Sequence, residues 1–464
     1  MMKGRMDKKT AFSVGRISLA VLSLLLLLSC PALPLGAQSR FPRPDFESGY
    51  QYPELSYAVP SETVWGWIDV SVLLLLLCVM TWAVHRKRTR TPIIISSALS
   101  VGYFGFFRGG CVCSIGSVQN VALALVDPGY HLPIYVLLFF LLPLVFALFF
   151  GRVFCGGVCP FGALQDLVNV KNLRISRPLA KALGVIPWIY LSFTLIYALT
   201  RSQFLICRFD PFIGIFRLGG DFGLIVFGVA LLILAVFTGR PFCRFLCPYG
   251  ALLSLVSAVS VKKITITPHK CVNCQLCHSS CPVDALRPPY GNTGREESRT
   301  SSVGRVLLYA LLIPLLTVGC AFLLRSWAPQ MSLANKEVHL LKLVTYSEQH
   351  PDGTPTPEVE AFYAQGRTKE ELQRSVDKVH SDFRLYGFWG GALIGLVIGL
   401  TLLSLTTRRK RPDYEIAQRE CVACGRCFRY CPQNMAAAAK PVGSASVPSS
   451  TDTSSTPESP SQSI

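Results

Sequence analysis

Two cysteine runs of identical spacing are the residues of this 464-residue chain best suited to chemistry. Each run follows the pattern Cys-x-x-Cys-x-x-Cys-x-x-x-Cys-Pro, one from Cys271 to Pro282 and one from Cys421 to Pro432. Three thiolates at this spacing bind one [4Fe-4S] cluster, and in two-cluster ferredoxins the fourth cysteine ligates the other cluster. The pattern therefore predicts one cluster on Cys271, Cys274, Cys277 and Cys431, and a second on Cys421, Cys424, Cys427 and Cys281.

Two alternatives to this assignment stay open at the level of sequence. Zinc also binds closely spaced cysteines, although zinc sites rarely space four of them in this way. The second run also begins far from the first, at Cys421 instead of beside Cys281. Each run could therefore form its own one-cluster module, whereas an even number of membrane crossings between them would allow a single split ferredoxin domain.

A near-repeat carries four further cysteines. Residues 151–164 (GRVFCGGVCPFGAL) and 239–252 (GRPFCRFLCPYGAL) share a Cys-x-x-x-Cys-Pro core, and we name its cysteines the repeat cysteines: Cys155, Cys159, Cys243 and Cys247. If the two units pack face to face, the four thiols meet at the cytoplasmic edge of the membrane as a complete ligand set for a further iron-sulfur or other redox metal site. Inert packing of small apolar side chains and thiol chemistry are the alternatives.

Three other cysteines are expected at the opposite membrane face. These outer cysteines, Cys111, Cys113 and Cys207, precede the two repeats and would face an oxidising compartment. For these outer cysteines, a disulfide or a redox relay is an alternative to simple packing of their side chains. Of the rest, Cys30 falls in a predicted signal peptide, while Cys78 and Cys320 stand alone in apolar spans and are expected to be core residues.

Composition and apolar runs indicate that membrane helices position these cysteines. Apolar residues make up 51% of the chain and charged residues 16%, with a mean hydropathy of +0.42, whereas soluble domains average about a quarter charged. A disordered chain and an ordinary cytosolic enzyme are thereby excluded. Apolar runs near the length of a bilayer crossing predict seven spans, at 64–84, 92–107, 131–151, 182–200, 222–238, 303–326 and 384–406.

The formal net charge of +18 falls mostly at one end of these spans. Basic clusters at 85–90 and 408–411 each follow a span, and such clusters mark cytoplasmic ends. We therefore predict a multi-pass protein of the bacterial inner membrane, with its N-terminus outside after signal removal and both cysteine runs in the cytoplasm. Because the charge is explained by orientation, nucleic acid is excluded as a partner.

The predicted fold class is mainly α: a polytopic helical membrane protein with a tandem two-span repeat and a split bacterial-type 2[4Fe-4S] ferredoxin domain. The predicted segments are a signal peptide at 1–37, an extracytoplasmic stretch at 38–63, a membrane body with five spans at 64–260, a first ferredoxin motif at 261–302, a span at 303–326, an extracytoplasmic loop at 327–383, a span at 384–406, a second ferredoxin motif at 407–440 and a disordered tail at 441–464.

Two local signals lie near the last span. Thr368-x-x-Glu371 is a capping-box pattern and predicts the start of a helix within the extracytoplasmic loop. A stripe of glycines then runs along the span itself and would let another helix approach closely. Its members are Gly387, Gly391, Gly395 and Gly399.

From Cys111 onward the chain resembles the NosR/NapH-type membrane polyferredoxins, bacterial proteins linked to quinol-fed electron supply for periplasmic nitrogen-oxide reductases. The matching residues are the repeat cysteines, Cys207 with the following Asp210-Pro211-Phe212, and both ferredoxin runs. NosR-like members also carry an extracytoplasmic flavin-binding domain near the N-terminus. The short stretch at 38–63 leaves no room for it, so no flavin is expected.

These observations predict an electron-transfer subunit more than a stand-alone enzyme. It would pass electrons between a quinol or cytoplasmic donor and a membrane or periplasmic redox partner, so its partners are membrane lipid and redox proteins on one or both faces. Two alternatives are a thiol-disulfide transporter of reducing equivalents and an assembly or metal-reduction factor for a metalloenzyme. No Gly-x-Gly-x-x-Gly follows a strand and no phosphate-binding loop is present, so no nicotinamide cofactor is expected.

Overall fold

The computed structural model describes most of the chain between residues 63 and 432. The described ranges are 63–110, 113–170, 172–265, 271–272, 274–289, 299–350, 356–406 and 414–432. Helices dominate these residues, and the sheet that they contain has two strands, which confirms the mainly α fold. The predicted signal peptide at 1–37, the tail at 441–464, Cys30 and Cys111 lie outside the described residues.

Four described helical stretches are long and apolar enough to cross a membrane. They are α2 with its π-helical extension η1 (Thr63–Lys87), α8 with α9 (Arg177–Leu199), Leu308–Ser326 of α16 and Lys369–Leu405 of α20. Three other predicted spans form shorter apolar helices: α3 with η2 (Thr91–Phe107), α5 (Ile134–Phe150) and α12 (Phe222–Phe237). A crossing needs about 20 residues, so the structure has four full-length candidate spans among its described residues where the sequence predicted seven.

The boundaries of the short helices have local causes. Helix α5 ends at Gly151, whose φ of 75° lies in a region that glycine tolerates and other residues avoid. Helix α12 begins at Asp221, whose side chain caps the helix by accepting a hydrogen bond from the backbone N–H of Gly223. The last residues of the two helices, Phe150 and Phe237, lie just before the Gly-Arg pairs that open the two repeats.

The two repeats fold alike. In each, a short helix follows the Gly-Arg pair and a second helix begins at the proline of Cys-Pro, which gives α6 (Val153–Gly157) and α7 (Pro160–Val168), and then α13 (Pro241–Phe245) and α14 (Pro248–Ala258). Proline suits a first helical position because its missing N–H has no partner there in any case. Cys159 and Cys247 consequently become N-cap residues, each at the start of a helix.

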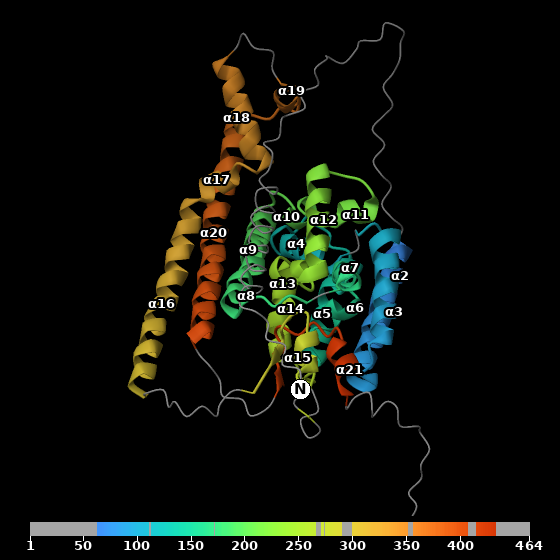
Figure 1. The fold of residues 1–464 in the computed structure, drawn as a ribbon. Helices are drawn as coiled ribbons and strands as arrows, with labels where there is room; N and C mark the ends of the chain where they lie inside the picture. The colour runs from blue at the N-terminus through green and yellow to red at the C-terminus, as the bar shows by residue number, and fades with distance from the viewer. Residues whose placement is uncertain are drawn as a thin grey trace, which may run out of the picture.

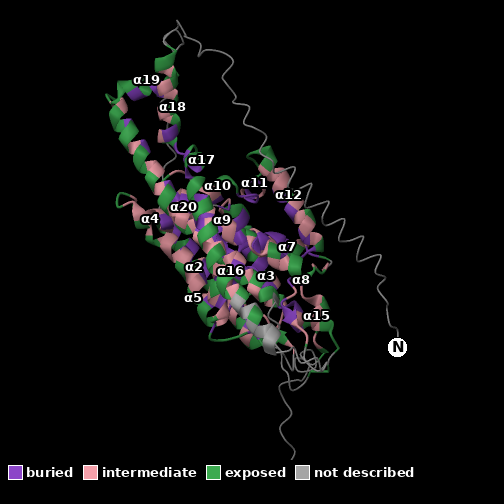
Figure 2. Cartoon of the chain, turned by 90° about the vertical axis from the view of Figure 1, so that its left-hand side faces the viewer, coloured by how far each residue is buried: buried purple, intermediate pink, exposed green. Residues whose placement is uncertain are grey.

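Helices α16 (Arg299–Ser326) and α20 (Lys369–Thr406) form a long hairpin at one edge of the molecule, as Figure 1 shows. A Cβ atom added at Gly391 would overlap the carbonyl oxygen of Cys320, and one at Gly395 would overlap that of Leu316. The predicted close approach at the glycine stripe is therefore confirmed. Most of this hairpin is exposed or half-buried, whereas the buried residues concentrate in the central body (Figure 2).

The start of α20 confirms the capping box. Thr368 Oγ1 accepts a hydrogen bond from the backbone N–H of Glu371 at 3.4 Å, and the Glu371 carboxylate accepts one from the backbone N–H of Thr368 at 3.3 Å. The helix then runs unbroken from Lys369 to Thr406. One continuous helix therefore joins the last part of the predicted loop at 327–383 to the predicted span at 384–406.

The far end of this hairpin carries a small helical cap. Helices α18 (Lys336–Gln349) and α19 (Pro357–Ala364) pack there beside the first turns of α20, and α17 (Ala328–Ser332) joins α16 to them. Phe362 and Leu372 are buried between these helices. Figure 1 places this cap at the opposite end of the molecule from α15 and α21.

The two cysteine runs lie together in one module, here called the ferredoxin module (described residues 271–289 and 414–432). Strand β1 (Leu286–Arg287) pairs antiparallel with β2 (Glu415–Ile416), with Leu286 opposite Ile416. One short helix from each run, α15 (Leu276–Ser280) and α21 (Arg426–Tyr430), packs against the other. The predicted split domain is therefore confirmed, since the α16–α20 hairpin returns the chain to its starting end.

Candidate metal centre

The two cysteine runs adopt the same local backbone. The residue after the second cysteine, Gln275 in one run and Gly425 in the other, has φ of 62° and 69° and is the N-cap of the short helix that follows. This left-handed residue turns the chain sharply, so that the third cysteine begins the helix beside the first two. Equal spacing in the sequence thus produces equal local structure.

The fourth cysteine of each run lies with the other run. Burial and the nearby Cys424 thiol raise the pKa of Cys281. Burial raises the pKa of Cys427, and so do the thiols of Cys424, Cys421 and Cys281 and, least of all, that of Cys277. On the other side, burial, Cys274, Cys431 and Cys271 all raise the pKa of Cys277. The thiols therefore fall into two crosswise groups. We call them the exposed set (Cys271, Cys274, Cys277 and Cys431) and the embedded set (Cys281, Cys421, Cys424 and Cys427).

The two sets have different surroundings. Cys271 and Cys274 are exposed, whereas Cys424 is buried. All four cysteines of the embedded set line a small cavity, which is closed by apolar side chains that include Val84 and Ile264 of the membrane body. No three described His, Cys, Asp or Glu side chains lie close enough to hold one metal ion. The four thiols of the embedded set thus surround a small space, and the spacing of each run is the one by which ferredoxins bind [4Fe-4S] clusters.

The four repeat cysteines also converge. All four are buried, and Cys159 interacts electrostatically with both Cys243 and Cys247, while Cys243 interacts with Cys155. Hydrogen-bond donors reach three of the sulfur atoms: Arg152 Nη2 lies 3.7 Å from Cys155 Sγ, Gln165 Nε2 lies 3.7 Å from Cys243 Sγ, and the Gly250 N–H lies 3.2 Å from Cys247 Sγ. Such donors stabilise metal thiolates.

An arginine of each Gly-Arg pair supports this group. Arg240 is fully buried and donates to the carbonyl oxygens of Cys155 and Gly156, the latter at 2.7 Å. Arg152 donates from Nη1 to the carbonyl oxygen of Arg419 at 3.0 Å. The two related arginines thus have different neighbours. Arg240 joins the two repeats, and Arg152 joins the first repeat to the ferredoxin module.

A buried aspartate connects the same regions. The Asp166 carboxylate on α7 lies 3.3 Å from Arg90, 3.4 Å from Arg240 and 3.2 Å from Arg426 of the ferredoxin module. Burial alone would raise the pKa of Asp166, but Arg240, Arg426 and Arg90 outweigh it and lower that pKa below 3.8. Sequence reasoning missed Asp166. The signal that the sequence offered was the repeated Gly-Arg pair, because a buried arginine needs an acidic partner.

Two of the three outer cysteines, Cys113 and Cys207, lie in the described residues. Cys207 is exposed and accepts a hydrogen bond from Gln119 Nε2 at 3.5 Å. Cys113 is half-buried and is the N-cap of α4 (Ser114–Val126). Helix α4 contacts both α10 (Leu205–Arg208), which carries Cys207, and α14, which Cys247 caps. The membrane face of the outer cysteines stays a prediction.

The two solitary cysteines behave differently. Cys320 is half-buried and lies on α16 at the glycine stripe. Cys78 is exposed on α2, so the expectation that it is a core residue is wrong. Its side chain points away from the body, where apolar exposure is compatible with lipid. All sixteen cysteines in the described part of the chain are free.

The fold and the cysteine sites define the class: an iron-sulfur electron-transport protein with apolar membrane helices. Residues 132–178 and 221–267 match a family described as a 4Fe-4S binding domain, and residues 264–287 match a second family of the same description. The first family covers both repeats, and the second covers the first ferredoxin run. The repeats and the run thus have counterparts in recognised 4Fe-4S domains.

The curated relatives that the chain matches include proteins of the NosR and NapH types. The chain is 31% identical to the regulatory protein NosR of Pseudomonas aeruginosa over 44% of this chain and 30% of NosR. It is 27% identical to the ferredoxin-type protein NapH of Haemophilus influenzae over 49% and 82% of the two chains, and 30% identical to the putative electron transport protein YccM of Escherichia coli over 36% and 52%. The chain thus spans less than a third of NosR and about half of YccM. No solved structure matches it.

Proposed function

We propose that the protein carries two [4Fe-4S] clusters and passes electrons between a quinol or cytoplasmic donor and a membrane or periplasmic redox partner. The observation that carries this proposal is the crosswise grouping of the two runs. It supports the exposed set as ligands of one cluster and the embedded set as ligands of the other. When bound, each cluster would supply one-electron redox chemistry.

The residues of this chain would control access and potential. The exposed cysteines give a soluble donor protein a surface at which to approach, whereas the embedded set lies against Val84, Ile264 and Phe428. The backbone N–H of Ala285 donates to Cys281 Sγ at 3.3 Å. Burial and hydrogen bonds to sulfur both tune the potential of a cluster, so the two sites would differ in potential despite equal ligands.

The repeat cysteines are proposed as a third iron-sulfur or redox metal site. Their convergence, the donors to their sulfur atoms and the 4Fe-4S family match over both repeats support it. Thiol-disulfide transport is less favoured, because burial raises the pKa of Cys159, Cys243 and Cys247, and the thiolate is the reactive form in exchange. With Arg152 and Arg240 beside them, metal binding would compensate the thiolate charge.

The orientation follows from the charge. The ferredoxin module lies beside the basic segment at 85–90, which follows the candidate span of α2 and η1, and positive segments mark the cytoplasmic side. We therefore place the protein in the bacterial inner membrane with the ferredoxin module in the cytoplasm. Electrons would then pass from the exposed set through the embedded set toward the repeat cysteines.

Iron quantitation with electron paramagnetic resonance on anaerobically purified protein tests this proposal. Two clusters give about eight iron atoms per chain, and an iron-sulfur site at the repeats adds more. A variant with serine at all four repeat cysteines should lose only that additional iron, and Cys78→Ser is the matched control because Cys78 stands apart from these sites. A protein with fewer than four iron atoms, or zinc in their place, would contradict the two-cluster proposal.

A further inference from the structure

A large cavity lies between the membrane body and the ferredoxin module. Its volume is about 870 Å³, within the range of about 300 to 1,000 Å³ that small-molecule sites occupy. Its walls come from α8 (Arg177–Leu183), α13, α14, the last turns of α20 and the two strands of the ferredoxin module. Neither ferredoxin cysteine set lines it, and of the repeat cysteines only Cys243 does, so the cavity lies beside the proposed third site and apart from the two ferredoxin sites.

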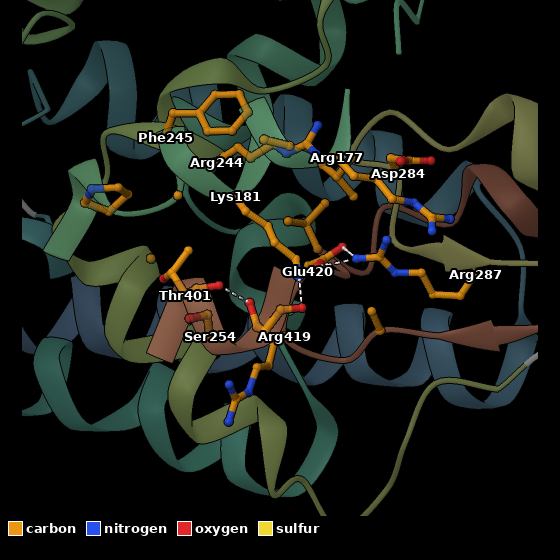
Figure 3. A pocket seen from close by; sticks show the side chains of 18 of the residues that line it. Arg177, Lys181, Arg244, Phe245, Ser254, Asp284, Arg287, Thr401, Arg419 and Glu420 are labelled. Atoms are coloured by element: carbon orange, nitrogen blue, oxygen red, sulfur yellow. Dashed lines mark hydrogen bonds and ion pairs between the residues drawn. The ribbon is translucent and has the colours of Figure 1, made fainter. Parts of the chain in front are cut away.

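The cavity carries an excess of positive charge. Seven basic and three acidic residues line it: Arg152, Arg177, Lys181, Arg240, Arg244, Arg287 and Arg419 against Asp284, Glu415 and Glu420. Figure 3 shows Arg287 paired with Glu420, with Lys181 of α8 close by and Arg177 of α8 and Arg244 of α13 along the same cavity wall. The cations thus outnumber the carboxylates.

Not every cationic side chain of the cavity has an acidic partner among the described residues. Arg287 binds Glu420 through two contacts of 2.5 and 2.7 Å. For Arg177 and Arg244, no ion pair is formed within the described part of the chain. Burial lowers the pKa of Arg244, although the nearby Glu420 and Asp284 act in the opposite direction. An anion in the cavity would add to the charge that these two carboxylates supply.

The position of the cavity favours an amphiphilic anion. Arg177 begins one candidate span, and Leu405 ends another, so the cationic groups lie at the level where membrane helices end. Trp188, Leu255 and Leu405 supply an apolar wall on the side of the membrane helices. A ligand with a phosphate group beside an apolar chain would match both parts, because arginine and lysine are common phosphate ligands.

We infer that this cavity binds the phosphate ester of an anionic phospholipid headgroup, with its acyl chains along α9, α14 and α20. This lipid site goes beyond the proposed electron-transfer function. Arg177 and Lys181 on α8 and Arg244 on α13 belong to the membrane body, while Arg287 belongs to the ferredoxin module. A bound headgroup would therefore join the two parts at the membrane surface.

The test compares two double variants in the full-length protein. Arg177→Gln with Lys181→Gln removes two charges four residues apart on α8, and Arg374→Gln with Lys378→Gln removes the same pair at the far end of α20, where both residues are exposed. Phospholipid retained per chain after detergent purification is measured by mass spectrometry. We expect retained phosphatidylglycerol to fall by about tenfold in the α8 variant, because charge-assisted contacts are lost, and to stay at the wild-type level in the α20 variant.

Thermal unfolding separates the sources of phosphate. Phosphatidylglycerol in nanodiscs should raise the Tm of the wild-type protein relative to phosphatidylcholine, and inorganic phosphate alone should not. If inorganic phosphate raises the Tm as much, the lipid assignment is overturned in favour of a soluble phosphate ligand. Equal lipid retention in both double variants would overturn the site altogether.

Iron content keeps this result independent of the proposed function. The α8 variant should retain the iron of the wild-type protein, so loss of lipid without loss of iron supports the inference. If its iron falls as well, a charge-preserving variant, Arg177→Lys with Lys181→Arg, decides the matter. Lipid retained by that variant supports the site, and lipid lost from it overturns the site.

Discussion

The exposed and embedded sets share one cysteine spacing and occupy opposite environments. Cys271 and Cys274 face solvent, while Cys424 is buried and its set lines a cavity closed by the membrane body. Their local backbones are nearly the same, with a left-handed residue at Gln275 and Gly425. Spacing therefore determines which cysteines gather, whereas tertiary packing determines how much water and charge surrounds them. The surrounding water and charge control the potential of a cluster and the access of its partners.

The largest expected effect comes from one serine in each set. Cys424→Ser should remove about four iron atoms and lower the Tm by about 5 °C or more, because a buried ligand is lost from a packed site. Cys274→Ser should cost similar iron with a much smaller change in Tm, since its side chain is exposed. Iron assay and differential scanning fluorimetry measure both. Equal Tm losses would remove the contrast between the sets.

The next effect tests what holds the embedded set in place. Asp166→Asn leaves Arg240, Arg426 and Arg90 without their shared carboxylate, and breaking such a buried pair costs about 3 to 5 kcal/mol. The paramagnetic signal of the embedded cluster should change and that of the exposed cluster should not. Asp127→Asn is the control, because its pair with Arg201 is far more exposed.

The same aspartate has a defined pH dependence. The pKa of Asp166 is lower in the folded protein than its ordinary 3.8, so its stabilising contribution is complete above the unfolded pKa and is lost as the pH falls through the folded one. The Tm difference between wild type and Asp166→Asn should therefore be constant from pH 5 to 8, within about 1 °C, and shrink below pH 4. A difference that shrinks near pH 6 would contradict the assigned charge state.

A smaller effect concerns the hairpin that brings the runs together. Gly391→Leu would force its side chain against the Cys320 carbonyl and separate α20 from α16, at a cost of about 1 to 3 kcal/mol. Both clusters should then lose occupancy together, since each proposed ligand set draws on both runs. Gly304→Leu on α16 is the control, because a Cβ there meets no atom within 4 Å. Loss of one cluster alone would argue against crosswise ligation.

The smallest expected effect is at the surface of the module. Arg287→Ala breaks the ion pair with Glu420, which joins the two runs across the strands. Since the Glu420 side chain is 39% exposed, solvent screening limits the loss to about 1 kcal/mol. Chemical denaturation followed by cluster absorbance measures it. A loss as large as that of Asp166→Asn would show that this exposed pair carries more of the interface than its burial implies.

Sequence patterns predicted the features that depend on neighbours in the chain. The cysteine spacing, the capping box at Thr368 and the glycine stripe each act over a few residues, so their outcome could be deduced locally. Span number was harder. Hydropathy alone could not show that the helices beside Gly151 and Asp221 have only 17 and 16 residues, or that α20 continues from a polar segment into an apolar one.

Long-range partners could not be deduced. Asp166 is separated from Arg426 by 260 residues, and no local pattern links them. The contact between α4, which Cys113 caps, and α14, which Cys247 caps, likewise depends on how short helices stack. In both cases the missing information was the tertiary arrangement of the membrane body, which hydropathy does not encode.

The return of the chain through the α16–α20 hairpin has a consequence for biogenesis. On the proposed ligand sets, neither cluster is complete until Cys421 to Cys431 have left the ribosome and the preceding helix has entered the membrane. A chain arrested after α16 would offer each cluster only part of its ligands. Cofactor loading thus becomes a checkpoint that reports complete insertion, and a half-made protein would present no competent electron carrier to the cytoplasm.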